Sequence, residues 1–268
     1  MIFKTYTPPL PLSEFVDSLW FWQYDGAPEP RARRLPTGSM EFVINLGERP
    51  FLIYDDSDLA KFERFDDLLI CGVQRAATLT NSSNRAIGVH FKPGGALPFL
   101  RMSLAELRDQ HISLETIWGA SARRLHCQLM EAKSIDRMFV LLESYLMANT
   151  LRPLSHHPAV AAALEEFANI SRVRAVSEVA KLTGYSRRRF IELFNEEVGL
   201  TPKIFSRIQR FQAALELVKR ARPVRWGDIA LACGYYDQAH LIRDFQAFCG
   251  LTPTTYVDEH LSDLSFSD

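Results

Sequence analysis

The sequence predicts an α+β protein: a small β-barrel or sandwich with helices over residues 1–152, then an all-α domain over residues 153–268. Three observations favour this division: short strand-like runs near the N-terminus, helical spacing after them, and a duplicated helical unit near the C-terminus. A chain of 268 residues has room for one large domain or two ordinary ones. Its 47% hydrophobic and 24% charged content is typical of a folded globular protein and excludes disordered and rod-like classes.

Apolar segments of strand length occupy the N-terminal part, separated by Pro, Gly, Asp and Ser clusters. They are residues 15–22, 41–46, 68–72 and 86–91. Such short strands predict a small antiparallel sandwich or barrel. Residues 95–150 then change to helical spacing, with apolar side chains three and four positions apart at Leu125, Leu129, Met138, Leu141, Leu142 and Tyr145. The prolines of residues 152–158 predict a linker, because proline cannot continue a helix.

The helical part contains an internal repeat. Ala180–Tyr185 aligns with Ala230–Tyr235 at an offset of 50, and Gly199–Pro202 aligns with Gly250–Pro253 at an offset of 51. In each copy a short helix ends at a glycine, a tight turn follows, and a longer amphipathic helix runs to a second glycine. A Thr-Pro pair then starts the next helix, since Thr can cap it and Pro fits its first turn.

Each copy also has the N-cap and the apolar stripe of a packed helix. Ser186 and Asp237 are good N-caps for the two longer helices. The stripes are Phe190, Leu193, Phe194 and Val198 in the first copy and Leu241, Phe245 and Phe248 in the second. Two helices across a glycine-containing turn describe either an ordinary helical hairpin or a helix-turn-helix. Three consecutive arginines, Arg187, Arg188 and Arg189, favour the helix-turn-helix, because the N-terminal turn of a recognition helix contacts bases and phosphates.

Charge is distributed unevenly, although the net charge is only −1. Residues 172–225 hold 13 basic and 5 acidic side chains, whereas residues 226–268 hold seven acids and a single Lys or Arg, Arg243. A local basic stretch of this kind suits a polyanion such as nucleic acid. We therefore expect the first unit to supply most of the phosphate contacts.

The second copy resembles the C-terminal helix-turn-helix of AraC-type transcription regulators. The resemblance lies in Ile229–Phe245 and Gly250–Tyr256, and it extends over roughly residues 158–260. It implies two helix-turn-helix units joined by a rigid linker helix over residues 202–220, which would be about 28 Å long. The recognition helices would be residues 187–198 and 238–248, and double-stranded DNA would be the partner.

The resemblance also implies which side chains face DNA. In the first unit they are Arg187, Arg188, Arg189 and Glu192; in the second they are Gln238, Ala239, His240 and Arg243. Arginine can bridge guanine O6 and N7, and glutamine can pair with adenine. Three positions keep a second interpretation. Glu192 could instead pair with Arg188 or Arg189, which we favour. Lys203, at the start of the linker helix, contacts phosphate or is merely solvated, and His240 contacts a base or packs within the fold.

The N-terminal part is similar to a sensor-like domain that precedes such regulators, through Leu35–Glu41 and Gly88–Ala96. Trp20, Trp22, Glu41, Asn45 and His90 either line a small-molecule pocket or belong to the core. A lone His90 without an H-x-H pair does not predict a metal site. We expect no catalytic group, no metal and no cofactor.

We therefore predict a cytoplasmic, sequence-specific DNA-binding transcription regulator that responds to a small molecule. The four cysteines are far apart, and no secretion signal or membrane-length apolar run is visible. Two rival classes stay open: an enzyme that uses the N-terminal barrel, and a methyl-acceptor DNA repair protein, which would need an activated cysteine cluster. Contact with RNA polymerase through the acidic second unit and formation of a homodimer are further expectations.

Overall fold

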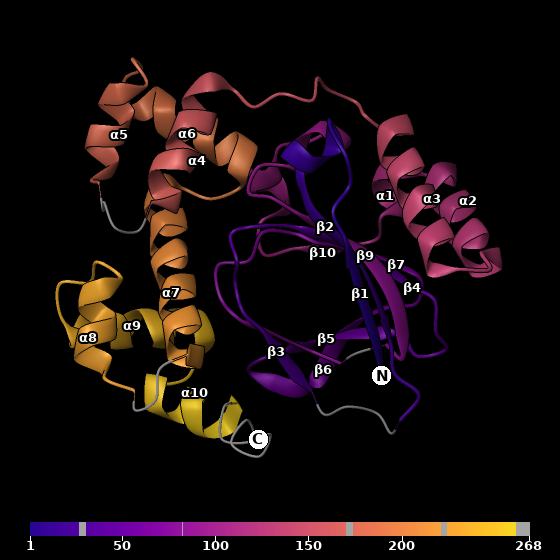
Figure 1. Ribbon diagram of the computed structural model, residues 1–268, viewed down its shortest axis with the longest axis horizontal. Helices are drawn as coiled ribbons and strands as arrows, with labels where there is room; N and C mark the ends of the chain where they lie inside the picture. Colours follow the sequence, from indigo (N-terminus) through magenta and orange to yellow (C-terminus); the bar gives the residue numbers. More distant parts are fainter. Residues whose placement is uncertain (27–30, 82, 170–173, 221–223, 261–268) are drawn as a thin grey trace.

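The N-terminal half of the protein is built on two antiparallel sheets (Figure 1). The computed structural model describes residues 1–26, 31–81, 83–169, 174–220 and 224–260. The larger sheet has six strands in the order β1-β2-β9-β4-β7-β10. Their bounds are β1 Ile2–Tyr6, β2 Val16–Gln23, β4 Glu41–Asn45, β7 Leu68–Cys71, β9 Arg85–Phe91 and β10 His111–Ile112.

The second sheet has four strands in the order β3-β8-β5-β6. These are β3 Ala32–Arg34, β5 Phe51–Asp55, β6 Asp58–Phe65 and β8 Thr78–Thr80. Three short 3-10 turns connect and flank the sheets: η1 Leu12–Glu14, η2 Leu97–Phe99 and η3 Leu104–Leu107. The helices of this half are α1 Glu115–Trp118, α2 Ala120–Glu131 and α3 Ile135–Ala148.

Strand alternation divides the side chains of the larger sheet between two environments. Phe42 and Ile44 of β4 belong to the large core that includes α2 and α3, whereas Val43 belongs to a small cluster with Phe51 and Ile53 of the second sheet. One face of the sheet is therefore covered by helices and the other faces the second sheet, as Figure 1 shows.

The C-terminal half is helical throughout its described residues. Its helices are α4 Pro158–Ala168, α5 Val176–Leu182, α6 Arg187–Val198, α7 Pro202–Arg220, α8 Trp226–Ala232, α9 Gln238–Cys249 and α10 Pro253–His260. In Figure 1, α5 and α6 lie at one end of α7, and α8 and α9 lie at its other end. Apolar side chains join α7 to both: the Phe194 and Phe205 rings are 5.5 Å apart, and the Phe211 and Phe245 rings 5.0 Å.

The predicted helix starts are confirmed. Ser186 Oγ accepts a hydrogen bond from the backbone N–H of Arg189, and the Asp237 carboxylate accepts one from His240. Helices α7 and α10 start at Pro202 and Pro253, each after a threonine. Helix α7 has the bounds predicted for the linker helix, and α6 has those predicted for the first recognition helix. Helix α9 extends one residue beyond the predicted 238–248.

Four strands were predicted and ten are present within the described residues. Segments 15–22, 41–46, 68–72 and 86–91 correspond to β2, β4, β7 and β9, which are the four inner strands of the larger sheet. Strand β6 was not predicted because its residues are mostly exposed and charged side chains interrupt its apolar ones, so no apolar run marks it. The fold class itself is confirmed: a β-rich half with helices precedes an all-α half.

The two halves contact each other over α6 and α7. Arg108 donates from Nε to the backbone carbonyl of Gly199 at 2.7 Å and from Nη2 to Asn195 at 2.8 Å. The Arg108 contacts fix the first helix-turn-helix unit against the N-terminal half. Within the C-terminal half, His156 Nδ1 of the linker lies 2.6 Å from Glu197 Oε1 of α6, and Glu197 is only 7% exposed.

Removal of either recognition-helix cap is expected to lower the free energy of unfolding. Ser186→Ala and Asp237→Ala should each cost about 1 kcal/mol, since each leaves a helix-terminal N–H without its acceptor. Urea titration followed by circular dichroism measures this. Thr254→Ala, at an exposed site within α10, is the control and should change the midpoint little; equal effects at all three sites would contradict the capping role.

Candidate nucleic-acid interface and effector cavity

The N-terminal turn of α6 presents charged side chains to solvent. Arg187, Arg188 and Arg189 are all exposed, and the Arg188 side chain is 91% accessible. Arg188 Nε donates to Glu192 Oε1 at 3.0 Å, and Arg189 Nη1 lies 3.6 Å from Glu192 Oε2. The hydrogen bond from Arg188, with the two positive charges, holds the pKa of Glu192 below its usual value. Glu192 thus has the pairing that we favoured, and the arginines stay accessible.

The N-terminal turn of α9 is exposed in the same way but carries less charge. Gln238, Ala239 and Arg243 are exposed, and Arg243 Nε donates to the Ala239 carbonyl at 3.3 Å. His240 is half-buried, with its ring edge-on to Tyr235 at 5.2 Å. His240 therefore packs within the fold and also reaches the surface.

A groove of about 510 Å³ lies between the two units. Its walls come from the start of α5, from α7 and from α9: Arg174, Ala175, Val176, Lys203, Ser206, Arg207, Arg210, His240, Arg243 and Asp244. Five of these ten are Lys or Arg and one is acidic. The groove is thus a mainly basic surface that runs from the start of α5 past α7 to α9.

The basic side chains of this groove differ in whether they are paired with other groups of the protein. Arg174 pairs with Glu166 at 3.0 Å, and Arg207 pairs with Asp244 at 2.7 Å. Arg210 donates to the Gly234 carbonyl at 3.3 Å. Lys203 and Arg243 have no carboxylate partner among the described residues. These two are therefore the groove cations most available to an external anion.

A cavity of about 240 Å³ lies between the two sheets. Its apolar lining includes Val43, Phe51, Ile53 and Leu69, and its polar lining includes Arg34, Glu41, Thr80 and His90. Thr80 is 5% exposed, and its hydroxyl has no hydrogen-bond partner among the described residues. An apolar space with a few convergent polar groups, one of them unpaired, is typical of a small-molecule site.

Glu41 is the centre of a charged group in this cavity. Arg34 Nη1 donates to Glu41 Oε2 at 3.0 Å, and His90 Nδ1 lies 3.1 Å from Glu41 Oε1. Burial alone would raise the pKa of Glu41, but the His90 hydrogen bond and the Arg34 charge outweigh it and lower the pKa. Burial opposes protonation of His90, yet the bond and charge of Glu41 raise the His90 pKa above its usual 6.5.

Two further cavity groups are held neutral. Burial, with the nearby Glu41 charge, raises the pKa of the Cys71 thiol to about 12. Burial also lowers the pKa of His111 to about 4. At neutral pH the cavity therefore offers the Arg34–Glu41–His90 group, a neutral thiol and a neutral imidazole.

Trp20 and Trp22 line a neighbouring pocket of about 330 Å³, together with Phe3. Arg34, Glu41 and Phe51 line this pocket as well as the main cavity, so the two are adjacent lobes. Gly88 makes room for Trp20, because a Cβ at that glycine would lie 2.5 Å from the Trp20 ring. Four of the five predicted ligand-binding side chains thus reach one two-lobed site.

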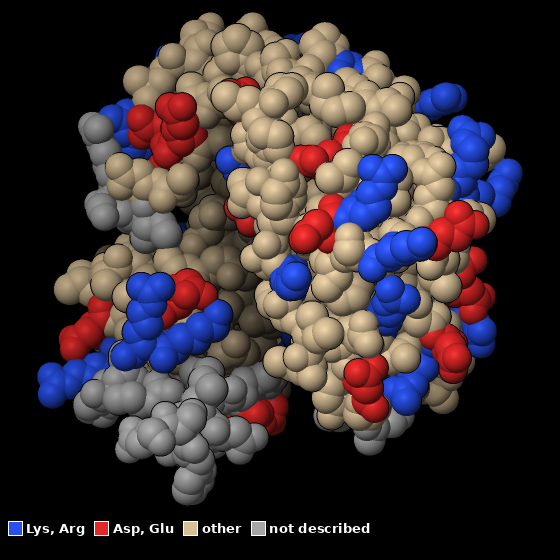
Figure 2. All heavy atoms as spheres, turned by 45° about the vertical axis from the view of Figure 1, so that its right-hand side comes forward, with Lys and Arg blue, Asp and Glu red and all other residues tan. Residues whose placement is uncertain are grey.

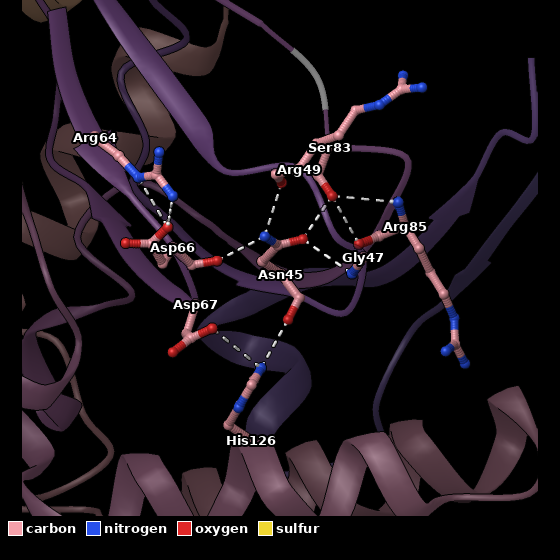
Figure 3. Close-up of polar contacts among 9 residues, drawn as sticks. All are labelled: Asn45, Gly47, Arg49, Arg64, Asp66, Asp67, Ser83, Arg85 and His126. Carbon is pink, nitrogen blue, oxygen red and sulfur yellow. Dashed lines mark hydrogen bonds and ion pairs between the residues drawn. The ribbon is translucent and has the colours of Figure 1, made fainter. Parts of the chain in front are cut away.

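Asn45 does not reach it, which corrects that prediction (Figure 3). Asn45 ends β4, and its amide donates to the carbonyls of Arg49 at 2.8 Å and Asp66 at 2.6 Å. Its Oδ1 accepts from the Gly47 backbone at 3.0 Å and from Ser83 at 2.5 Å. With all its hydrogen-bonding capacity used to hold the turns at this end of the sheet, Asn45 is a structural residue.

The cavity wall is also a contact with α7. Residues 34–41 contribute Arg34, Leu35, Pro36, Thr37, Ser39 and Glu41 to the lining. On the outside of the same segment, Gln209 donates to the Thr37 carbonyl at 3.1 Å and Gln212 to the Pro36 carbonyl at 2.7 Å. Gly38 has a positive φ of 84°, and a Cβ there would lie 2.9 Å from the Phe205 ring. A side chain at residue 38 would therefore push the cavity wall away from α7.

Gln209 and Gln212 are the functional candidates that sequence reasoning missed. They lie on the polar side of an amphipathic helix, where glutamine is ordinary, so no local signal distinguishes them. Only the resemblance of Leu35–Glu41 to a sensor-like domain pointed to the segment that they bind.

The face of the N-terminal half seen in Figure 2 carries intermingled acidic and basic side chains. No group of three or more His, Cys, Asp or Glu side chains in the described part of the chain could hold a metal ion. Of the helices that the structure describes, none has the length and apolar character needed to span a bilayer.

Two family models match the chain, one in each half. Residues 179–259 match a helix-turn-helix domain, and residues 4–113 match a domain of unknown function, DUF6597. The helix-turn-helix match runs from within α5 to α10 and so includes both capped helices and the groove residues of α7 and α9. The chain carries an AraC-type helix-turn-helix domain. Helices α1 to α4 lie outside both matches.

Relatives of the AraC-type domain are named as regulators. An uncharacterised HTH-type transcriptional regulator of Haemophilus influenzae is 32% identical over 81 residues, which is 30% of this chain and 27% of that protein. The HTH-type regulator YbfI of Bacillus subtilis is 24% identical over 80% of this chain and 76% of its own length. A solved AraC-type regulator from Chromobacterium violaceum, 24% identical, aligns with 39% of this chain and 94% of its own at a TM-score of 0.35.

Replacement of Glu41 by Gln is expected to destabilise the protein most between about pH 4.5 and 6.5, the usual values of the two groups. The lowered pKa of Glu41 gives stability that is lost as pH falls through its folded value. The raised pKa of His90 gives stability that is lost as pH rises through its folded value. Above the raised folded pKa of His90, the variant should lose only the ion pair with Arg34.

Urea titrations of wild type and Glu41→Gln at a series of pH values measure this difference. Glu115→Gln, which removes a surface pair with Arg123, is the control and should show little effect. A Glu41→Gln effect that does not change across the range would contradict the coupling to His90.

Proposed function

We propose that this AraC-type regulator binds double-stranded DNA in a sequence-specific way and controls transcription. One observation carries the proposal: two capped helices with exposed N-terminal turns, α6 and α9, lie at opposite ends of a single helix. Helix α7 has 19 residues, so it is about 28 Å long, comparable with the ~34 Å between successive major-groove faces. Each recognition helix can then enter one of two adjacent major grooves.

The proposed contact residues divide into those that contact bases and one that contacts phosphate. Arg188, with Arg187 and Arg189 beside it, and Glu192 face the first groove. Gln238, Ala239, His240 and Arg243 face the second. Lys203, which has no carboxylate partner among the described residues, would contact a phosphate at the N-terminus of α7. Contact with RNA polymerase and homodimer formation stay predictions, and the comparisons give no support to an enzymatic role.

Substitution of Arg188 and Arg189 together by Ala is expected to weaken operator binding by about 2–5 kcal/mol, through loss of a base contact and a phosphate contact. Loss of the exposed ion pairs with Glu192 should lower the stability of the protein little. Binding sites selected from random DNA provide the operator, and gel-shift titration at fixed salt provides the affinity. Arg123→Ala with Arg124→Ala removes the same charge from exposed positions of α2 and should leave affinity unchanged. Unchanged affinity in the Arg188/Arg189 variant would contradict the proposal.

We also propose that a small molecule bound between the sheets regulates DNA binding. The supporting observation is that residues 34–41 form a wall of the cavity on one side and bind α7 on the other. A ligand that displaces this wall must also change its contacts with α7, and linkage makes the effect reciprocal. Glu41 already pairs with both Arg34 and His90, and much of the remaining lining is apolar, so the cavity favours a largely apolar ligand with a hydrogen-bonding group.

Reciprocity allows a test that needs no ligand. Operator binding is expected to slow amide hydrogen exchange in residues 34–41 of the wild type, because α7 becomes fixed on DNA. In a Gln209→Ala, Gln212→Ala variant the same DNA should protect α6 and α9 but not this segment. Glu216→Gln, farther along α7, is the control. Protection of α6 and α9 without any change at residues 34–41 in the wild type would contradict the coupling.

A further inference from the structure

We propose that the ion pair between Arg207 and Asp244 is a positioning element that sets the angle of α9 relative to α7. In this way it determines the spacing between two half-sites that the protein accepts. The inference rests on the proposed function, since only a protein that reads two half-sites has a spacing to set.

The geometry of this pair is directional. Arg207 Nε and Nη2 both donate to Asp244 Oδ1, at 3.1 and 2.7 Å. The guanidinium also lies over the Phe248 ring, 5.0 Å from its centroid. Asp244 and Phe248 are both buried residues of α9. A guanidinium that is held at its edge by two hydrogen bonds and at its face by a ring restricts rotation of α9 about its contact with α7.

The repeat shows what is unusual about Asp244. At the offset of 51 that aligns the recognition helices, Asp244 corresponds to Leu193 of α6, which is 9% exposed. The first recognition helix therefore has an apolar side chain where the second has a buried carboxylate. Burial of an apolar side chain stabilises the fold but does not depend on direction. A buried ion pair adds little net stability, because the cost of desolvation offsets the attraction between its charges. Specifying one geometry is the best-attested role of such a pair.

Unpaired polar atoms around Asp244 agree with a positioning role. Asp244 Oδ2 and the Tyr235 hydroxyl are both buried, and neither makes a hydrogen bond of good geometry among the described residues, an arrangement that costs stability. The two groups lie close to each other, since burial together with the charge and side-chain contact of Asp244 raises the pKa of Tyr235. Arg210, one turn after Arg207 on α7, donates to the Gly234 carbonyl and lies 5.1 Å from the Tyr235 ring centroid. Two arginines of α7 thus hold the second unit, one at the turn before α9 and one at its middle.

The pair has a direct relation to the DNA-facing residues. Asp244 follows Arg243 along α9 and lines the same groove as His240. One added base pair moves a half-site by about 3.4 Å and rotates it by about 35°. A recognition helix held at a fixed angle cannot follow such a change, so the pair converts helix orientation into spacing selectivity.

The test compares operators that differ only in the distance between half-sites. The DNA is the sequence selected by the wild type, with one base pair removed, unchanged, or one added between the half-sites. The main variant is Arg207→Met with Asp244→Leu, which removes both charges together and leaves none unpaired in the interior. Lys203→Met is the matched control, because it removes a cation from the same groove without touching the pair. Affinity is measured by fluorescence anisotropy at fixed salt.

Wild type and Lys203→Met are expected to prefer the selected spacing by about tenfold or more, as for a mismatched site. Lys203→Met should bind all three DNAs more weakly by a similar factor. The double variant should show a preference below about threefold, with base preference inside each half-site unchanged. A folded double variant that retains the wild-type spacing profile overturns the proposal.

The experiment also distinguishes two further outcomes, an unfolded double variant and a wild type that does not bind DNA selectively. If circular dichroism shows that the double variant does not fold, Asp244→Asn is measured against the same criterion. If the wild type selects no DNA sequence, the proposed function fails, and this result is distinct from an unchanged spacing profile. The selectivity for spacing is a readout that a loss of stability alone does not move.

Discussion

The shared apolar core along α7 is the interaction on which the helical half depends. Phe205 closes the core of the first unit against Phe194, and Phe211 closes that of the second against Phe245. Ile208, between them, is fully buried. Because protein interiors are close-packed, a helix buried at both ends transmits the position of one unit to the other. The two helix-turn-helix units therefore form one rigid body through α7, rather than two modules joined by a flexible linker.

The N-terminal half uses the polar side of the same helix. Gln209 and Gln212 bind carbonyls of residues 34–41, while Lys203, Arg207 and Arg210 face the groove between the units. Helix α7 thus has a buried stripe, a face that contacts the cavity wall and a cationic face. This three-way division connects the cavity between the two sheets to the proposed DNA-binding surface without a separate signalling element.

The sequence predicted the helical half closely because its signals are local. Ser186, Asp237 and the Thr-Pro pairs fix helix starts within one turn, so caps and bounds could be read from neighbouring residues. The N-terminal half was predicted less completely, since strand β6 is mostly exposed and has no continuous apolar run. Asn45 was misassigned because strand alternation places it on the cavity side, and only the turn contacts at the end of β4 take it out of the site. The pairing of Arg207 with Asp244 links positions 37 residues apart, which no spacing rule detects.

Hydroxyl-radical footprinting of the wild type on its selected DNA tests the central claim most directly. A rigid reader with α6 and α9 at the two ends of α7 predicts two protected regions about one helical turn apart on the same face of the duplex. Scrambling the bases of either region should then weaken binding. A single protected region, with no effect of scrambling one turn away, would contradict the account, because α9 would then not read DNA.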